Sequence, residues 1–183
     1  MLISICGLQG SGKSTLSRKL QEKINNSICI DIDKISHSIY DNKDCYNEVI
    51  NTFKDVTTNN KIDRNKLGKI VFNSKEEMEK LTRCTWKYME KEIDSIIENN
   101  KDKVIILEWL LLNNTKYLKL SDLRILIEEK ESIRKERVLK RDNISEEKFY
   151  IRDKSAIPYK KEDFNCIINT VDNDTIERII KLI

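Results

Sequence analysis

The sequence predicts an α/β fold in which a five-stranded, mostly parallel sheet carries helices on both faces. Three observations predict it. Short apolar runs alternate with segments of helical periodicity, which is typical of parallel sheets. A glycine-rich loop joins the first apolar run to the first helical segment. Acidic residues follow two of the runs, at the edge where parallel sheets place their ligands.

The strands of this sheet are predicted at five short apolar runs, each long enough for a buried parallel strand. They span residues 2–6, 27–31, 103–107, 123–127 and 165–169. The second ends in the acidic stretch 31–33, and Glu108 follows the third. Because the carboxyl ends of parallel strands meet at one edge, these acids are expected near the loop that follows the first strand.

Helices are predicted wherever apolar residues recur at helical spacing. The first begins at Lys13, and successive amphipathic helices without a clear strand follow the second strand. A basic helix is predicted at 131–141, and Ile176 and Ile180 mark a last helix. We expect one domain with an inserted subdomain. It comprises a core of residues 1–33, 101–141 and 162–183, a helical insert at 34–100, and a mostly polar segment at 142–161 that holds the only proline, Pro158.

Composition excludes several classes of protein. Lys and Arg total 34 against 31 Asp and Glu, a net charge of +3, which does not favour a nucleic-acid binder. The sequence has no run of about 18 apolar residues, so no membrane span or membrane partner is expected. The five cysteines are scattered, without the spacing of a zinc site or a disulfide framework. A cytoplasmic protein, monomeric or weakly oligomeric, is therefore expected.

Residues 7–15 fit G-x-x-x-x-G-K-[ST], the phosphate-binding P-loop. Three of the four glycines, Gly7, Gly10 and Gly12, lie here, where a loop must curl and bring backbone N–H groups close to an anion. Lys13 would reach the β- and γ-phosphates of ATP, and the Ser14 hydroxyl would ligate Mg²⁺. The predicted nucleotide-binding residues of this loop are Gly10, Ser11, Gly12, Lys13, Ser14 and Thr15.

A P-loop alone does not separate kinases from GTPases, ATPases and sulfotransferases. The guanine motif N-K-x-D is absent from the sequence, and the length of 183 residues suits a small-molecule kinase. Such a kinase needs a carboxylate for the acceptor hydroxyl, a pocket for the acceptor, and arginines for the transferring phosphoryl group. The sequence offers candidates for all three.

Asp33 is the predicted catalytic carboxylate, because it comes just after the second strand and would face the γ-phosphate. The alternative is a helix N-cap, which an Asp before Lys34 would also suit. Asp31, two residues earlier, would point elsewhere or help to hold Mg²⁺ through water.

Arginines on the basic helix are the predicted phosphate ligands. Arg134, Arg137 and Arg141 recur at three- and four-residue spacing on one face, and Arg152 follows in the polar segment. This arrangement suits a lid that closes over the phosphates of ATP. The alternative is a solvated charged face, since several glutamates lie nearby. Arg141 and Arg152 are the favoured functional pair.

Five stretches together resemble the dephospho-coenzyme A kinase family, nearly from end to end. The stretch 62–72 is the most specific, whereas the P-loop is shared with many families. They are residues 7–15, 31–33, 62–72, 137–145 and 163–169.

The resemblance implies ATP-dependent phosphorylation of the ribose 3′-hydroxyl of dephospho-coenzyme A. Asp33 would be the catalytic base, and Arg64 and Glu108 would lie at the acceptor. Asn169 would lie near the adenine of ATP. The insert 34–100 would form the acceptor-binding domain and residues 142–161 the lid. Lys13 and Ser14 would bind the phosphates and Mg²⁺, with Arg141 and Arg152 as lid arginines.

The chain departs from the family pattern at three places. Arg83-Cys84 stand where the family usually has His-Pro, and residues 108–114 lack a proline and a final glutamate. Ala156 replaces a glutamine. These changes concern the acceptor pocket and the lid. A nucleoside or nucleoside-monophosphate kinase therefore remains an alternative, and a non-catalytic nucleotide-binding protein is a second one.

Overall fold

The computed structural model describes residues 1–154, 156 and 158–183. They divide into two compact units, one made of Met1–Asp31 with Asn100–Ile183 and the other of Ile32–Asn99. Of the segment predicted at 142–161, residues 155 and 157 lie outside the described part. The second unit covers nearly the same stretch as the predicted insert, and each unit has its own buried apolar side chains.

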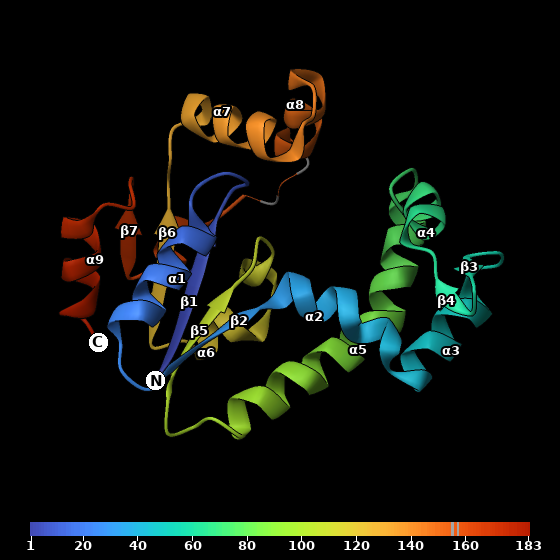
Figure 1. The fold of residues 1–183 in the computed structure, drawn as a ribbon, viewed down its shortest axis with the longest axis horizontal. Coiled ribbons are helices and arrows are strands. Elements are labelled where there is room, and N and C mark those ends of the chain that lie inside the picture. The colour runs from blue at the N-terminus through green and yellow to red at the C-terminus, as the bar shows by residue number, and fades with distance from the viewer. Residues whose placement is uncertain (155, 157) are drawn as a thin grey trace. The chain divides into compact units, whose positions relative to one another are not determined.

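The first unit contains a five-stranded parallel sheet of order β2-β5-β1-β6-β7 (Figure 1). All five predicted strands are confirmed, with ends that shift by one residue at most. β1 is central, and Glu108 at the end of β5 pairs in register with Ile5 and with Asp31 on the two neighbouring strands. The strands are β1 (Leu2–Gly7), β2 (Ser27–Asp31), β5 (Val104–Glu108), β6 (Leu123–Ile127) and β7 (Cys166–Ile168).

Helices cover both faces of this sheet, as predicted (Figure 1). On one face, α1 (Lys13–Lys23) and α9 (Asn173–Ile180) bury Leu16 and Ile176 against Ile3 and Ile5 of β1. On the other face lie η2 (Leu112–Asn114) and α6 (Lys116–Leu120). Successive residues of a strand point to opposite faces, so Ser4 meets this second layer, with its hydroxyl 2.5 Å from that of Ser121.

The basic segment after β6 forms a helical pair, α7 (Glu131–Asp142) and α8 (Glu146–Lys154). The helix predicted at 131–141 is confirmed. α8 was not predicted, because Phe149 is its only fully buried side chain and gives no helical periodicity. Asn143, in the left-handed conformation, ends α7. A short helix, η3 (Lys161–Asp163), precedes β7.

A buried ion pair fastens α8 to α7. Arg134 donates from both terminal nitrogens to the carboxylate of Asp153, and the side chains are only 6% and 13% exposed. The Arg134 guanidinium also lies 5.8 Å from the ring centroid of Phe149. The Gln9 side chain donates to the carbonyl of Phe149 at 3.2 Å, so α8 is also tied to the loop after β1.

The second unit is mainly helical. The prediction of no strand in this stretch was wrong, because a short hairpin joins β3 to β4 through Asn59 and Asn60, both at positive φ. α5 runs without a break through Arg83 and Cys84. The elements are α2 (Ile32–Ser38), η1 (Ile39–Asp41), α3 (Lys43–Thr52), β3 (Thr57–Thr58), β4 (Lys61–Ile62), α4 (Arg64–Val71) and α5 (Lys75–Glu98).

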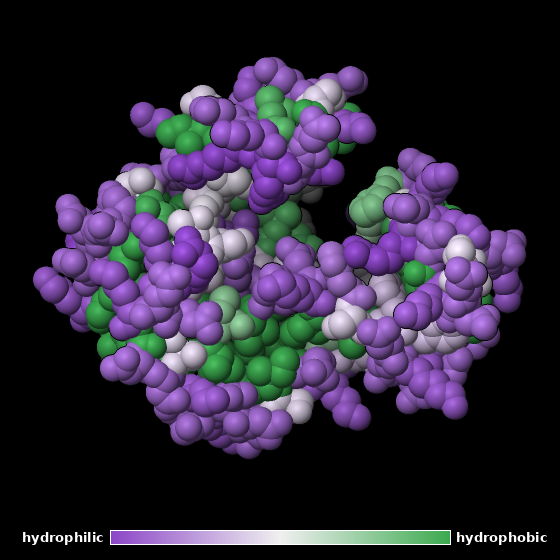
Figure 2. All heavy atoms as spheres, viewed as in Figure 1, coloured by the Kyte–Doolittle hydropathy of each residue, from purple (hydrophilic) through white to green (hydrophobic). Residues whose placement is uncertain are grey.

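The surface matches the highly charged composition. Hydrophilic residues predominate on the face seen in Figure 2, including the exposed side of α7 and α8. None of the helices in the described residues combines the length and apolarity that crossing a membrane requires.

Replacing Asp153 by Asn leaves Arg134 buried without a charged partner. We therefore expect the free energy of unfolding to fall by roughly 3–5 kcal/mol, measured by chemical denaturation. Glu147→Gln, an exposed change on the same helix, is the control and should cost no more than about 1 kcal/mol. Equal losses in the two variants would show that the Arg134–Asp153 pair does not anchor α8.

Candidate functional site

The loop between β1 and α1 requires glycine for two physical reasons. Gly10 and Gly12 have φ values of 76° and 100°, which residues with a Cβ rarely adopt. A Cβ on Gly10 would also lie 2.6 Å from the carbonyl oxygen of Arg134, so no side chain fits between the loop and α7. The loop backbone is therefore packed directly against the helix that carries the arginines.

A cavity of about 300 Å³ opens beside this loop. Its described lining contains three cationic side chains and no acidic one, and it lies at the N-terminus of α1, whose dipole also favours anions. Lys13 donates to the carbonyls of Gly7 and Leu8, at 2.9 and 3.2 Å, which holds its ammonium group over the loop. The lining residues are Gly10, Gly12, Lys13, Ser14, Thr15, Arg137 and Arg141.

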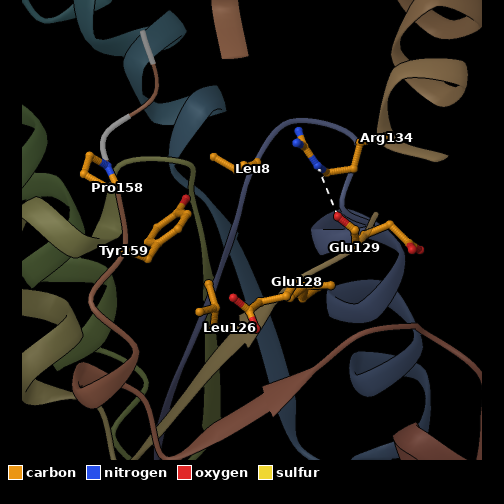
Figure 3. Close-up of a pocket in the computed structure, with 8 residues that line it drawn as sticks. Leu8, Leu126, Glu128, Glu129, Arg134, Pro158 and Tyr159 are labelled. Atoms are coloured by element: carbon orange, nitrogen blue, oxygen red, sulfur yellow. Dashed lines mark hydrogen bonds between the residues drawn. The ribbon is translucent and has the colours of Figure 1, made fainter. Parts of the chain in front are cut away.

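A second cavity, of about 260 Å³, lies beside Leu8 at the start of the same loop (Figure 3). Glu128 and Glu129 line it, and the Arg134 guanidinium donates to the Glu129 carbonyl at 3.3 Å. Of its described lining only Arg134 is cationic, and that guanidinium is paired with Asp153, so the cavity offers little to a polyphosphate. The cavity beside Lys13 is therefore the candidate phosphate site.

Glu108 lies at the carboxyl edge of the sheet, against α1. Its carboxylate accepts hydrogen bonds from the hydroxyls of Ser14 and Ser17, the latter at 3.1 Å. The register places Asp31 on the neighbouring strand beside it. These oxygen donors suit Mg²⁺, which takes few protein ligands and completes its shell with water and phosphate. Among the described residues, no group of three or more His, Cys, Asp or Glu side chains is placed to hold a metal ion.

The predicted arginines have different roles in the structure. Arg134 is buried in the contact with α8, whereas Arg137 donates to the Gly10 carbonyl at 3.2 Å and pairs with Glu129. Arg141 and Arg152 both bind the carboxylate of Asp142. The hydrogen bond from Arg141 holds the pKa of Asp142 below its ordinary value, so this carboxylate is ionised at neutral pH. The sequence analysis did not single out Asp142.

Asn169 follows β7 at the carboxyl edge of the sheet and is exposed. Two residues later, Val171 packs against the loop, since a Cβ on Gly12 would lie 3.3 Å from its side chain. This places the segment after β7 next to the candidate phosphate site.

Asp33 and Arg64 belong to the second unit. Asp33 is exposed in the first turn of α2, one residue inside the helix rather than at its cap. Arg64 begins α4 and lines a cavity of about 380 Å³. The described lining has three cationic side chains, one histidine and one acidic side chain, which favours an anionic ligand. Its described lining is His37, Tyr40, Asp41, Lys43, Tyr46, Asn60, Lys61, Ile62 and Arg64.

Taken together, the fold and the loop define a P-loop kinase. A parallel sheet sends its central strand through a glycine-rich loop into a helix, with cationic side chains around the loop. The family model for dephospho-CoA kinase matches residues 1–177. The chain belongs to the dephospho-CoA kinase family, a family of phosphotransferases.

Relatives with that name support the assignment. The dephospho-CoA kinase of Aquifex aeolicus (strain VF5) is 35% identical over 164 residues, which cover 87% of this chain and 82% of the relative. The dephospho-CoA kinase of Fusobacterium nucleatum is 35% identical over 149 residues, covering 80% and 76%.

Solved structures agree with the fold. Dephospho-CoA kinase from Campylobacter jejuni is similar with a TM-score of 0.69 and 27% identity, covering 98% of this chain and 95% of that one. TT1252 from Thermus thermophilus is similar with a TM-score of 0.84 and 22% identity, covering 99% and 94%. Shikimate kinase from Acinetobacter baumannii, with a TM-score of 0.57, 16% identity and coverage of 99% and 91%, shares the fold.

Replacing Gly10 by Ala forces either the loop or α7 to move. We therefore expect at least about tenfold weaker ATP binding, measured by calorimetry. Gly68→Ala is the control: Gly68 lies inside α4, and its added Cβ would approach only the exposed ring of Phe72, at 3.2 Å. The control should keep its ATP affinity and gain stability from helix propensity. Unchanged ATP binding by Gly10→Ala would contradict the packing argument.

Proposed function

We propose that this chain transfers the γ-phosphoryl group of ATP to the ribose 3′-hydroxyl of dephospho-coenzyme A. Family membership supports the reaction and the acceptor. The observation that carries the proposal for this chain is the cationic cavity beside Lys13, with Glu108 and Ser14 at its edge. A polyphosphate and Mg²⁺ need that combination of cations and oxygen donors.

ATP is proposed to bind with its phosphates in this cavity. The backbone N–H groups from Gly10 to Thr15 would surround the phosphates, and Lys13 would exchange its carbonyl contacts for phosphate oxygens. Ser14 would ligate Mg²⁺, which supplies charge neutralisation between the β- and γ-phosphates. Glu108 holds the Ser14 hydroxyl at that place. Asn169 would lie near the adenine.

Asp33 is proposed to orient the 3′-hydroxyl and accept its proton. A carboxylate in this role needs an exposed position and a fixed backbone, and the first turn of α2 provides both. The arginines of α7 and α8 would bind the oxygens of the group being transferred, where negative charge develops. A guanidinium can donate two parallel hydrogen bonds to such oxygens.

The acceptor is proposed to occupy the cavity around Arg64. Dephospho-coenzyme A carries a diphosphate and an adenine ring, and the cavity offers basic side chains together with Tyr40 and Tyr46. Burial raises the pKa of Tyr40, so its hydroxyl stays protonated and available as a donor. We further propose a cytoplasmic enzyme, because all five cysteines are free thiols, as a reducing compartment keeps them. We also propose that it is monomeric or weakly oligomeric.

A coupled assay of ADP formation tests the reaction. The wild-type protein should form ADP only when dephospho-coenzyme A is present, and Asp33→Asn should lower kcat by about 10²–10⁴-fold through loss of the base. Asp55→Asn is the control, because Asp55 is exposed in the same unit at a positive φ that Asn tolerates.

The same assay separates the alternatives. ADP formation that responds to a nucleoside or nucleoside monophosphate, and not to dephospho-coenzyme A, would identify a different acceptor. ATP binding without transfer to any acceptor in the panel would identify a non-catalytic nucleotide-binding protein.

Arg64→Gln tests the acceptor cavity. Loss of a charge-assisted hydrogen bond should raise KM for dephospho-coenzyme A about tenfold or more and leave KM for ATP near the wild-type value. Lys69→Gln removes an exposed cation from the same helix and should change neither constant. A rise in KM for ATP alone would exclude Arg64 from the acceptor site.

A further inference from the structure

Asp142 occupies an unfavourable place for an acid. It is the last residue of α7, where the negative end of the helix dipole repels a carboxylate. Asn143 then ends the helix in the left-handed conformation. Helix stability alone would favour a neutral or basic residue at this position, so the carboxylate calls for another explanation.

The contacts of Asp142 supply that explanation. Its Oδ1 accepts from Nε of Arg141 at 2.7 Å, and its Oδ2 accepts from Nη2 of Arg141 at 3.2 Å and from Nη1 of Arg152 at 3.0 Å. One carboxylate thus holds two guanidinium groups from two helices. Its side chain is 24% exposed, while those of Arg141 and Arg152 are 64% and 51% exposed. The Asp142 carboxylate is therefore the least exposed of these three charged side chains.

The geometry keeps Arg141 available for a ligand. A guanidinium has five N–H donors, and the hydrogen bonds to Asp142 use one on Nε and one on Nη2. Arg141 also lines the candidate phosphate cavity beside Gly12 and Lys13. Asp142 therefore binds one edge of this guanidinium without occupying all the donors that would meet a phosphate.

The attachment of α8 fixes the second arginine. Arg152 directly precedes Asp153, whose carboxylate is held by the buried Arg134. Phe149, fully buried one turn earlier, and the hydrogen bond from Gln9 hold the same helix against the loop. Arg152 thus reaches Asp142 from a backbone that is already fixed.

Electrostatics explains why a carboxylate is needed there. Two guanidinium groups brought close together repel each other, and the anion between them offsets that repulsion. Without it, the exposed Arg141 side chain would sample many rotamers and would have to be ordered again when a ligand binds.

We propose that Asp142 is a positioning residue that holds Arg141 and Arg152 as a pair for the transferring phosphoryl group. The inference rests on the proposed function, because it assumes that these arginines bind the phosphates of ATP. Asp142 itself touches neither substrate. It acts through the two guanidinium groups.

Steady-state kinetics of Asp142→Asn gives the first test. Asparagine keeps the size of the side chain and removes its charge, so kcat/KM for ATP should fall about tenfold, with a matching loss of affinity for a non-hydrolysable ATP analogue. KM for dephospho-coenzyme A should not change. The melting temperature should stay equal or rise, because the unfavourable charge at the helix end is gone. Glu136→Gln removes an exposed acid from the same helix and should behave as wild type.

A double-mutant cycle gives the second test. In an Arg141→Ala background, Asp142→Asn should cost clearly less than in the wild type, since half of the pair is already lost. Asp142→Glu, which keeps the charge, should recover part of the activity. The same cycle, measured as affinity for a non-hydrolysable ATP analogue, does not depend on the acceptor. It therefore separates failure of this inference from failure of the proposed reaction.

Three outcomes would overturn the proposal. Asp142→Asn could match Glu136→Gln in kinetics and analogue binding, so that the carboxylate has no role. It could bind ATP more tightly, so that Asp142 competes with phosphate rather than positions the arginines. It could lose activity only in proportion to a lower melting temperature, with fully additive effects in the cycle, so that its role is structural.

Discussion

The close contact between the loop after β1 and helix α7 is the constraint on which the rest of the site depends. Because the backbone of Gly10 lies against the Arg134 carbonyl, the position of the loop sets the position of α7. α7 in turn carries Arg137 and Arg141 to the phosphate cavity, and Arg134 from the same helix secures α8. This close contact between two backbone segments thus helps to set where the arginines proposed to bind the phosphoryl group lie relative to the P-loop.

The cations around this loop are already engaged by the protein. Lys13 binds two loop carbonyls, Arg137 binds Glu129 and the Gly10 carbonyl, and Arg141 binds Asp142. A phosphate would therefore replace the carbonyl contacts of Lys13 and Arg137, whereas Arg141 would keep Asp142 and use its remaining donors. The affinity for phosphate would then be the difference between two sets of hydrogen bonds. The arrangement limits reorganisation on binding, because each side chain is held near the place where it would act.

The sequence alone predicted the sheet and the P-loop, because each depends on local patterns: five apolar runs, and glycines at fixed spacing before Lys13. It missed α8, since one buried residue, Phe149, holds that helix in place and leaves no periodicity. It placed Arg134 on one helix face with Arg137 and Arg141. Arg134 is buried because it pairs with Asp153, 19 residues further along the chain, and helical spacing does not reveal that contact. Asp142 was missed for the same reason: its role arises only when α8 brings Arg152 beside Arg141.

Glu108 shows how one side chain connects the sheet to the first turn of α1. Its carboxylate reaches from the end of β5 toward α1. There it spans two hydroxyls one turn apart, Ser14 and Ser17, and the Ser17 hydroxyl also donates to the Lys13 carbonyl at 2.8 Å. Glu108 therefore ties together the first turn of α1, which begins with Lys13 and Ser14. A residue predicted to lie at the acceptor thus contacts, in this structure, residues proposed to bind phosphate and metal.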